Sequence, residues 1–344
     1  IWLTAYKVYY CKVKEKPIMS KFLHLYNTFR TKFVSSKANV VQWYPGHMQD
    51  GLYKIQAKLK SVDCIVEIHD ARIPFSGRNL RFRDIIQLRP HILLLNKVDL
   101  TDLNENDSLR ENVVTKLKNQ GVDNVFFTNL IQSNVSHDQL LCELLPAARQ
   151  LIASRPRYSR EETEELNLLV VGVPNVGKST FINSLRTLHM KKKGKATTVG
   201  AIAGITRSVL SKIKISMHPP VYIIDTPGIM PPKIQGLETG MRLAACACLP
   251  DHLVGELNIA DYILFWMNSR RIFSYVEYFE LEQPTDNILD VLANIAIKNK
   301  HILRVKNATN QYVYRPDIDV AARLFFSAFR YGKLGKFVLD DNYL

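Results

Sequence analysis

The order of the nucleotide-binding motifs constrains this chain of 344 residues more than any other feature. Asn-Lys-Val-Asp at residues 96–99 precedes the glycine-rich loop Gly-Val-Pro-Asn-Val-Gly-Lys-Ser at residues 172–179, and Asp-Thr-Pro-Gly follows at 225–228. In the usual order the glycine-rich loop opens the domain and the Asn-Lys-x-Asp tetrapeptide lies well downstream. Domain termini usually lie close together and can be joined without loss of the fold. The sequence therefore predicts a circularly permuted nucleotide-binding domain.

The segments around these motifs predict an α/β fold. Each motif directly follows a short apolar run, and further apolar runs at residues 62–68 and 125–127 alternate with helical segments. This alternation predicts a parallel sheet with helices on both faces. The motifs then lie at the carboxyl ends of strands, where open sheets bind their ligands. The polar stretch 154–165 suits the join that a permutation creates.

The glycine-rich loop fits GxxxxGKS without exception. Its backbone N–H groups and the start of the following helix are suited to bind phosphates. In this pattern Lys178 neutralises the β- and γ-phosphates, and the Ser179 hydroxyl is a ligand of Mg²⁺. The predicted nucleotide-binding residues here are Pro174, Asn175, Val176, Gly177, Lys178, Ser179 and Thr180. The loop alone would accept ATP as readily as GTP.

Asn96, Lys97 and Asp99 make the distinction in favour of guanine. The Asp99 carboxylate can accept hydrogen bonds from guanine N1–H and from the 2-amino group, neither of which adenine offers. A site built to bind such groups rejects analogues that lack them by roughly 10⁴-fold or more. Lys97 can lie along the base plane, and Asn96 ties the loop to neighbouring backbone. Thr128 and Asn129 are weaker candidates for a contact with guanine O6.

The Asp-Thr-Pro-Gly motif predicts the second switch of a GTPase. Asp225 would hold Mg²⁺ through water, and the Gly228 N–H would sense the γ-phosphate. Ile229 stands where many signalling GTPases carry the glutamine that orients water, so we expect slow intrinsic hydrolysis. Thr206 is the candidate switch threonine that completes the magnesium shell. The alternatives for that role are Thr197 and Thr198.

The charge distribution favours a polyanionic partner. The formal net charge is +14, and residues 166–224 contain no Asp or Glu. A one-signed field of this kind attracts nucleic acid in a salt-dependent manner. The five cysteines show no metal-ligand spacing, and Cys246 and Cys248 are expected in a helix core. No apolar run approaches the roughly 20 residues that a membrane span needs.

The sequence divides into three predicted parts. Residues 1–40 form a leader, residues 41–236 the permuted domain, and residues 237–344 a smaller helical domain. In the leader, residues 19–40 are basic, rich in hydroxyl groups and free of acids, with apolar residues on one helical face. That pattern is typical of a mitochondrial transit peptide, with an ordinary surface helix as the alternative. Met19 is a candidate start of translation.

The motif set resembles the YlqF/RbgA family of ribosome-assembly GTPases. The resemblance rests on the permuted order, on Gln-Trp-Tyr-Pro-Gly-His-Met at residues 42–48, on Asp-Ala-Arg-Ile-Pro at 70–74, and on the phosphate and second-switch motifs. It implies a GTPase that binds the large ribosomal subunit and its rRNA late in assembly and is released after hydrolysis. With the leader, it implies the mitochondrial matrix, with peripheral association at the inner membrane left open.

The resemblance assigns roles to two further residues. His47 occupies the position proposed in the family to assist hydrolysis, although a loop or capping role is an equal alternative. Asn175 matches an asparagine that related enzymes use to hold K⁺. Ala203 departs from the proline that the family usually carries before the switch threonine. The predicted catalytic residues are His47, Lys178, Thr206 and Gly228, and the predicted metal ligands are Ser179, Thr206 and Asp225 for Mg²⁺ and Asn175 for K⁺.

The C-terminal part predicts a helical module with an RNA contact. Arg323, Arg330, Lys333 and Lys336 interleave with aromatic residues that are expected mostly in the core, while the basic side chains can contact phosphates. The alternative to an enzyme is a nucleotide-gated binding module, in which GTP holds a conformation and catalysis is incidental. A weaker alternative is a tRNA-modifying or membrane-remodelling GTPase. The absence of an additional catalytic cysteine motif and of an apolar membrane segment counts against it.

Overall fold

A computed structural model describes residues 29–35, 55–78, 89–131, 135–157, 160–190, 212–226, 234 and 236–343, with the backbone alone at 135–141, 189 and 190. The chain forms two compact units. The first unit described here, the α/β unit, contains residues 37–254 and 336–344, and the second, the C-terminal unit, contains residues 1–36 and 255–335. Residues 237–254 and 336–344 were predicted to belong to the C-terminal domain, whereas their contacts group them with the α/β unit.

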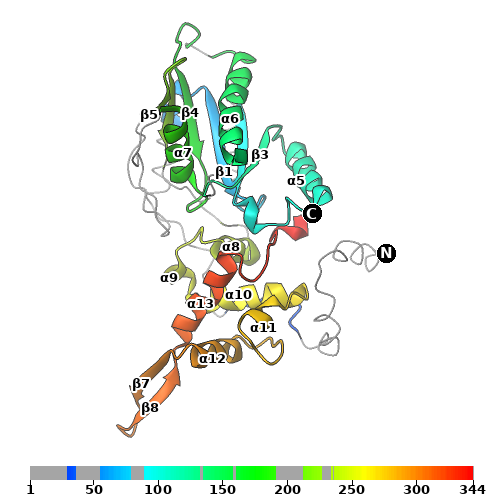
Figure 1. Ribbon diagram of the computed structural model, residues 1–344, viewed down its shortest axis with the longest axis vertical. Coiled ribbons are helices and arrows are strands. Elements are labelled where there is room, and N and C mark those ends of the chain that lie inside the picture. The colour runs from blue at the N-terminus through cyan, green and yellow to red at the C-terminus, as the bar shows by residue number, and fades with distance from the viewer. Residues whose placement is uncertain are drawn as a thin grey trace. The chain divides into compact units, whose positions relative to one another are not determined.

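The α/β unit is built on a six-stranded sheet in the order β3-β2-β1-β4-β6-β5 (Figure 1). The predicted α/β fold is confirmed, and five of the strands pair in parallel. Strand β5, which pairs antiparallel with β6 and forms an edge of the sheet, was not predicted. The strands are β1 (Cys64–Asp70), β2 (His91–Asn96), β3 (Val125–Thr128), β4 (Leu166–Val171), β5 (Lys212–Ser216) and β6 (Val221–Asp225).

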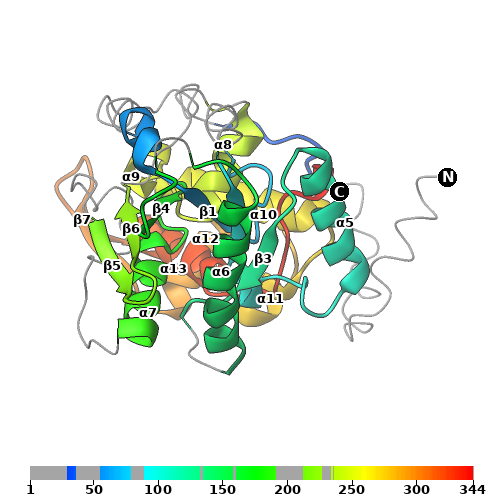
Figure 2. The same ribbon diagram turned by 90° about the horizontal axis from the view of Figure 1, so that it is seen from above.

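Helices cover both faces of this sheet. Two views place α6 and α7 over the same face (Figures 1 and 2). On the opposite face, α5 packs its apolar side chains against Leu93 and Leu95 of β2, and Ile55 and Val62 pack around Ile65 of β1. The helices of the unit are α5 (Asp107–Asn119), α6 (Val135–Ala153), α7 (Lys178–Met190), α8 (Leu237–Ala245) and α9 (Asp251–Val254), with 3-10 turns η2 (Leu59–Ser61), η3 (Val98–Leu100) and η4 (Asp341–Tyr343).

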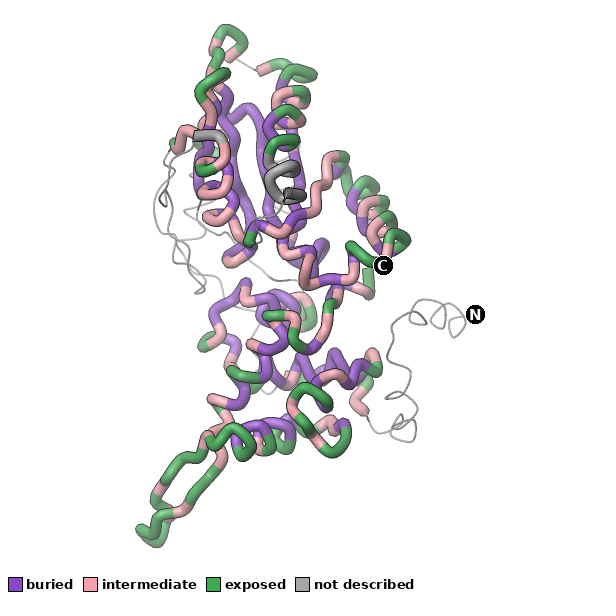
Figure 3. The backbone as a smooth tube through the Cα atoms, in the orientation of Figure 1, coloured by how far each residue is buried: buried purple, intermediate pink, exposed green. Residues whose placement is uncertain are grey.

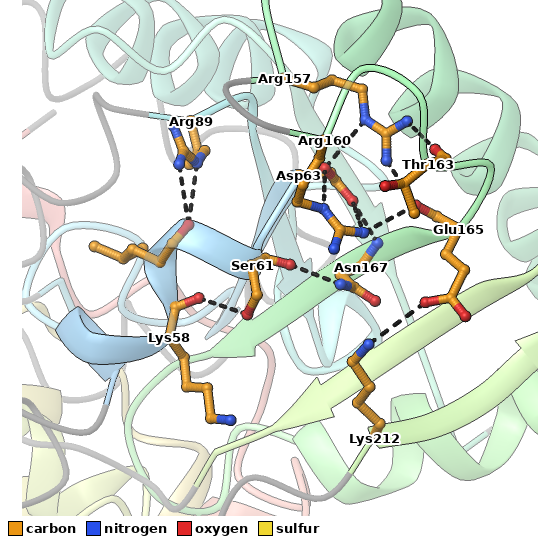
Figure 4. Close-up of polar contacts among 11 residues, drawn as sticks. Lys58, Ser61, Asp63, Arg89, Arg157, Arg160, Thr163, Glu165, Asn167 and Lys212 are labelled. Carbon is orange, nitrogen blue, oxygen red and sulfur yellow. Dashed lines mark hydrogen bonds and ion pairs between the residues drawn. The ribbon is translucent and has the colours of Figure 1, made fainter.

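The predicted join is held by a buried carboxylate (Figure 4). Asp63 lies just before β1 and accepts hydrogen bonds from Arg157 Nε and Arg160 Nε, each at 3.2 Å. The same carboxylate accepts from the Asn167 backbone N–H of β4 at 2.8 Å. Arg157 also donates to the Glu165 carbonyl at 2.6 Å. The join is therefore fixed to the amino ends of the two central strands β1 and β4, opposite the edge that carries the nucleotide motifs.

The C-terminal unit is a helical module that carries a β-hairpin. Phe325 and Phe329 on α13 are buried, as the sequence analysis expected for the aromatic residues of this region, and they pack on Tyr275 and Trp266. The hairpin was not predicted, and most of its residues are exposed (Figure 3). The elements are α10 (Glu256–Ser269), α11 (Ser274–Tyr278), α12 (Ile288–Lys298), β7 (Ile302–Lys306), β8 (Tyr312–Pro316) and α13 (Ile318–Arg330).

Part of the predicted leader belongs to this unit. The Arg30 guanidinium donates to both carboxylate oxygens of Asp261, at 2.7 and 3.0 Å, and its Nε donates to Asp286 at 3.0 Å. Phe33 is buried, with ring centroids 5.2 Å from Tyr262 and 5.7 Å from Phe265. Residues 29–35, called the N-terminal strap below, therefore contribute to the core of the C-terminal unit.

Candidate functional site

The carboxyl ends of five parallel strands bring the described motif residues to one edge of the sheet. Asp70 at the end of β1 lies opposite Asn96 at the end of β2, and Asn96 lies opposite Thr128 at the end of β3. On the other side of β1, Val170 of β4 lies opposite Asp225 at the end of β6. The predicted base-binding and phosphate-binding segments therefore meet, although 72 residues or more separate the first motif from the second along the chain.

The phosphate loop requires glycine at two positions. A Cβ on Gly172 would lie 2.3 Å from the Ile68 carbonyl oxygen, and a Cβ on Gly177 would lie 2.4 Å from Asn96 Nδ2. Gly177 also has a φ of +105°, in the region that favours glycine. Close approach of this loop to β1 and to the base-recognition motif therefore depends on the absence of side chains. Helix α7 begins at Lys178, directly after the loop.

Asn96 joins the base-recognition motif to the phosphate loop. Its side chain is almost fully buried, and Nδ2 donates to the Val176 carbonyl at 2.7 Å. Its Oδ1 accepts from the Leu130 N–H, beyond β3, at 3.0 Å. One amide thus fixes three strand ends relative to one another, which preorganises the edge where base and phosphates would lie. A contact of Asn96 with neighbouring backbone was predicted from the sequence, but its partners Val176 and Leu130 were not.

Two buried oxygen atoms lie where guanine recognition is predicted. Asp99 Oδ1 and Thr128 Oγ1 are buried and accept or donate no hydrogen bond within the described part of the chain. Leaving a buried polar atom unpaired costs about 1–3 kcal/mol, and such atoms commonly mark a ligand site. Asn129 Oδ1 accepts from the Ile131 N–H at 3.2 Å, so this side chain shapes the loop after β3.

Lys178 and Asp225 form the charged centre of the phosphate side. Lys178 is buried and donates to the carbonyls of Gly172 at 3.1 Å and Val173 at 2.8 Å. Burial lowers the pKa of Lys178 to about 8, and Asp225 opposes part of that shift. Burial also raises the pKa of the Asp225 carboxyl, against the attraction of Lys178. Asp225 Oδ1 is buried without a hydrogen-bond partner among the residues described.

Comparisons with known proteins agree with this geometry. The family described as 50S ribosome-binding GTPase matches residues 167–308. Mitochondrial ribosome-associated GTPase 1 of Mus musculus is 47% identical over 307 residues, which cover 88% of this chain and 91% of that protein. The chain belongs to the mitochondrial ribosome-associated GTPase 1 family.

More distant relatives extend the family to bacteria. Ribosome biogenesis GTPase A of Bacillus licheniformis is 31% identical over 262 residues, covering 75% of this chain and 86% of that protein. The crystal structure of GNP-bound YlqF from T. maritima aligns with a TM-score of 0.51 and 24% identity, over 83% of this chain and 96% of that chain, and supports the fold. The predicted resemblance to the YlqF/RbgA family is confirmed, and the chain is a GTPase of the mitochondrial ribosome-associated group.

In this member of the family, an unpredicted ion-pair cluster supports the base-recognition loop. Lys97 has a left-handed backbone, and its Nζ lies 2.9 Å from Asp70 Oδ2. Asp70 is fully buried and also receives hydrogen bonds from Arg72 Nε at 2.9 Å and Nη2 at 2.8 Å. The two cations hold the pKa of the Asp70 carboxyl well below its usual range, although burial opposes them. The Asp-Ala-Arg-Ile-Pro motif thus orients Lys97.

A second unpredicted connection runs from the phosphate loop of this GTPase to α8. Asn175 Nδ2 donates to the Ala247 carbonyl, just after α8, at 2.8 Å. Within α8, Arg242 is buried and lies 3.3 Å from Asp340 near the end of the chain. Cys246 and Cys248 are buried beside this turn, and burial raises the pKa of the Cys248 thiol to about 11. Both cysteines are core residues, immediately after the helix.

The structure places the remaining predicted residues as follows. Ser179 and Thr180 lie in the first turn of α7, and Pro174 and Val176 lie in the phosphate loop. His47, Thr206, Gly228 and the alternatives Thr197 and Thr198 lie outside the described residues. Most of the acid-free basic segment between α7 and β5 also lies outside them. Among the helices that are described, none has the length and apolar character needed to cross a membrane.

Proposed function

We propose that the chain is a GTP-hydrolysing assembly factor of the mitochondrial large ribosomal subunit. In this proposal it binds the subunit and its rRNA in the GTP state and leaves after hydrolysis. The observation that carries the nucleotide part is the Asn96 bridge, which fixes a guanine-specific loop against a phosphate loop. The names of the relatives, mitochondrial ribosome-associated GTPase 1 and ribosome biogenesis GTPase A, support the ribosomal part.

In the proposed site, Asp99 accepts from the guanine N1–H and 2-amino groups. Its buried, unpaired Oδ1 supports this role, because a carboxylate oxygen in that position has no other partner among the described residues. Lys97 is already held by Asp70, so its stem is ordered before the base arrives. Preorganisation of this kind lowers the entropy cost of binding. Thr128, whose hydroxyl is also buried and unpaired, closes the base pocket beside Asn129.

On the phosphate side, Lys178 moves from the loop carbonyls to the β- and γ-phosphates. The oxygen donors of Ser179, Asp225 and Thr206 suit Mg²⁺, and the unpaired buried Asp225 Oδ1 fits that group. Mg²⁺ bound there would neutralise charge on the phosphate oxygens. The Asn175 amide supplies an oxygen of the kind that hard cations bind, and its nitrogen donates to the Ala247 carbonyl. Gly228 would sense the γ-phosphate, and His47 would assist the attacking water in place of glutamine.

The contacts of α8 suggest how nucleotide state reaches the end of the chain. Helix α8 follows the second switch in the sequence, and Ala247 in the turn just after it accepts a hydrogen bond from Asn175 of the phosphate loop. Arg242 of α8 contacts the tail through Asp340. We infer that α8 and residues 336–343 respond together to the γ-phosphate. Hydrogen exchange should therefore change in both segments between GDP and a non-hydrolysable GTP analogue. A change in α8 without one in the tail would contradict this inference.

The N-terminal strap bears on localisation. The relatives are mitochondrial by name, and we propose import into the matrix, with peripheral association at the inner membrane as a further prediction. Because Arg30 and Phe33 pack into the C-terminal unit, we propose that processing of the leader takes place before Phe29. The amino-terminal sequence of the protein isolated from mitochondria tests this. A mature chain that begins after Phe33 would refute it.

The decisive experiment measures GTP hydrolysis by the full chain with and without mitochondrial large subunits, in potassium and then sodium buffer. We expect stimulation by subunits, with a larger rate in potassium, and we expect Asn175→Ala to remove the difference between the two cations. Small subunits serve as the matched control. Absence of stimulation by large subunits in either buffer would favour the nucleotide-gated binding module, which the isoleucine at position 229 already motivates.

A further inference from the structure

The hairpin of β7 and β8 presents two chemically different faces. The register pairs Arg304 with Tyr314 and Lys306 with Tyr312, and side chains alternate between faces along each strand. Arg304, Lys306, Tyr312 and Tyr314 therefore share one face, called the stacking face below. Leu303, Val305, Val313 and Arg315 share the opposite face.

The stacking face is exposed and combines aromatic rings with cations. Tyr312 is 55% exposed and Tyr314 is 71% exposed, and both basic side chains of this face are exposed as well. The Arg304 guanidinium lies 3.8 Å from the centroid of the Tyr312 ring, and Lys306 Nζ lies 5.4 Å from it. Exposed aromatic rings clustered with cations are typical of a surface that binds nucleic-acid bases.

The sequence of the hairpin and of the helix end before it carries only basic charges, although Lys298 pairs with Glu280 and Asp317 caps α13 at the base of the hairpin. Residues 291–316 contain no Asp or Glu. Within the described part of the chain, the cations of the stacking face form no ion pair with a carboxylate, so their charge is available to a ligand. Such a field attracts a polyanion. The basic residues of the segment are Lys298, Lys300, Arg304, Lys306 and Arg315.

The hairpin is ordered before any ligand binds. The Asn307 side chain accepts hydrogen bonds from the backbone N–H groups of Thr309 at 3.0 Å and Gln311 at 2.9 Å, which fixes the turn. At the base, the Asp317 N–H donates to the His301 carbonyl at 2.9 Å, and the Asp317 carboxylate caps α13. A rigid platform loses little conformational entropy when it binds.

We propose that the stacking face binds unpaired nucleotides of RNA. Tyr312 and Tyr314 stack on successive bases, and Arg304 and Lys306 bind the flanking phosphates. The two tyrosines are two residues apart on one strand, which places their Cα atoms about 6.6 Å apart. Each ring can therefore receive its own base. Paired bases in a duplex are already stacked and offer no free face. The identification of RNA as the nucleic acid rests on the proposed ribosomal function.

A membrane surface fits the hairpin less well. The turn is Asn307-Ala-Thr-Asn-Gln311, which is polar and lacks the apolar side chains that enter the interface of a bilayer. The exposed apolar residues Ile302 and Leu303 lie at the base of the hairpin, away from the turn. Tyrosines flanked by cations, with a polar turn, therefore favour RNA.

The test measures binding of the full chain to a fluorescent single-stranded RNA of 20 or so nucleotides, by anisotropy over a series of salt concentrations. Replacing Tyr314 with Ala should weaken binding by about 5- to 150-fold, as the loss of one stacked base predicts. The double variant Arg304→Gln, Lys306→Gln should make the plot of the logarithm of the association constant against the logarithm of the salt concentration less steep, by about 1.4 in slope. Arg315→Gln is the matched control, because it removes an exposed arginine from the opposite face of the same hairpin.

Equal effects of Arg304→Gln and Arg315→Gln would refute the proposal, because they would show that the hairpin contributes only its positive charge and that neither face binds specifically. Duplex RNA bound as tightly as single strands would also overturn it, as would vesicles containing anionic lipid that bind the hairpin and displace the RNA. Tm values of all variants identify a loss of folding. Because this assay uses free RNA, a negative result would refute the stacking face without bearing on subunit-stimulated GTP hydrolysis. Conversely, absence of stimulation by subunits would refute the proposed function without changing the measured RNA binding.

Discussion

The N-terminal strap offers a sharp test of the C-terminal unit. We expect Phe33→Ala to destabilise this unit by about 3 kcal/mol, at the lower end for loss of a buried phenylalanine, because Phe33 packs on Tyr262 and Phe265 but keeps 9% of its surface exposed. Arg30→Ala should cost about 1.5–3 kcal/mol, since it removes charge-assisted hydrogen bonds from two half-buried carboxylates. Val34→Ala is the matched control, because Val34 is 77% exposed and should change stability by less than about 0.5 kcal/mol.

Region-resolved hydrogen exchange is the appropriate assay, because the chain has two units and its unfolding is not expected to be two-state. Each 1.4 kcal/mol corresponds to about tenfold in exchange rate, so Phe33→Ala should accelerate exchange in α10 by roughly 100-fold. Amides of β1 belong to the other unit and should not change. Equal acceleration in β1, or an effect of Val34→Ala as large as that of Phe33→Ala, would refute the assigned packing.

Three further predictions concern nucleotide binding. Asp99→Asn should lower GTP affinity by about 100-fold or more, through loss of charge-assisted hydrogen bonds, and should admit xanthine nucleotides; competition binding checks both. Burial lowers the pKa of Lys178 to about 8, and the phosphates of GTP favour its charged form, so GTP binding should take up a proton as pH rises through 8. Calorimetry in buffers of different ionisation enthalpy measures this proton uptake, which should be absent in Lys178→Met. Gly177→Ala should displace Asn96 and lower GTP affinity at least tenfold. Gly121→Ala, which has the same kind of positive φ (+82°) but open space around its Cβ, controls for backbone strain and should leave affinity unchanged.

The sign of the Lys178 prediction follows from linkage. The nucleotide-free folded state has a lowered lysine pKa, so between about 8 and the ordinary value of 10.5 it binds fewer protons than the unfolded chain. Stability of the nucleotide-free protein should therefore rise with pH in this window, while affinity for anionic nucleotide falls. Opposite slopes for stability and affinity distinguish Lys178 from a group that simply loses charge. Parallel slopes would contradict the assignment.

The sequence predicted the fold and the principal motif residues because these depend on local patterns. Apolar runs followed by Gly-rich or Asn-Lys-x-Asp motifs determine strand ends, and strand ends meet at one edge of a parallel sheet. Edge strand β5 was missed because its residues alternate charged and apolar, Lys-Ile-Lys-Ile-Ser, without an apolar run. The hairpin was also missed, because both of its strands are mostly exposed and neither contains a buried apolar run.

What the sequence could not predict is how the permuted chain satisfies the backbone beyond β1. Because β1 lies between β2 and β4, its continuation at residues 71–76 is buried past the end of the sheet. After Ala71, whose N–H donates to the Asn96 carbonyl, no strand within the described part of the chain pairs with this segment. Buried N–H and C=O groups must find partners. The end of the chain supplies partners for three of them, because Asp340 accepts from the Phe75 and Ser76 N–H groups at 2.7 Å and the Leu339 N–H donates to the Arg72 carbonyl at 2.7 Å. These contacts join residues more than 260 positions apart, so no periodicity reveals them. In this permuted domain, the backbone that follows the central strand β1 is thus completed by hydrogen bonds from the C-terminal tail.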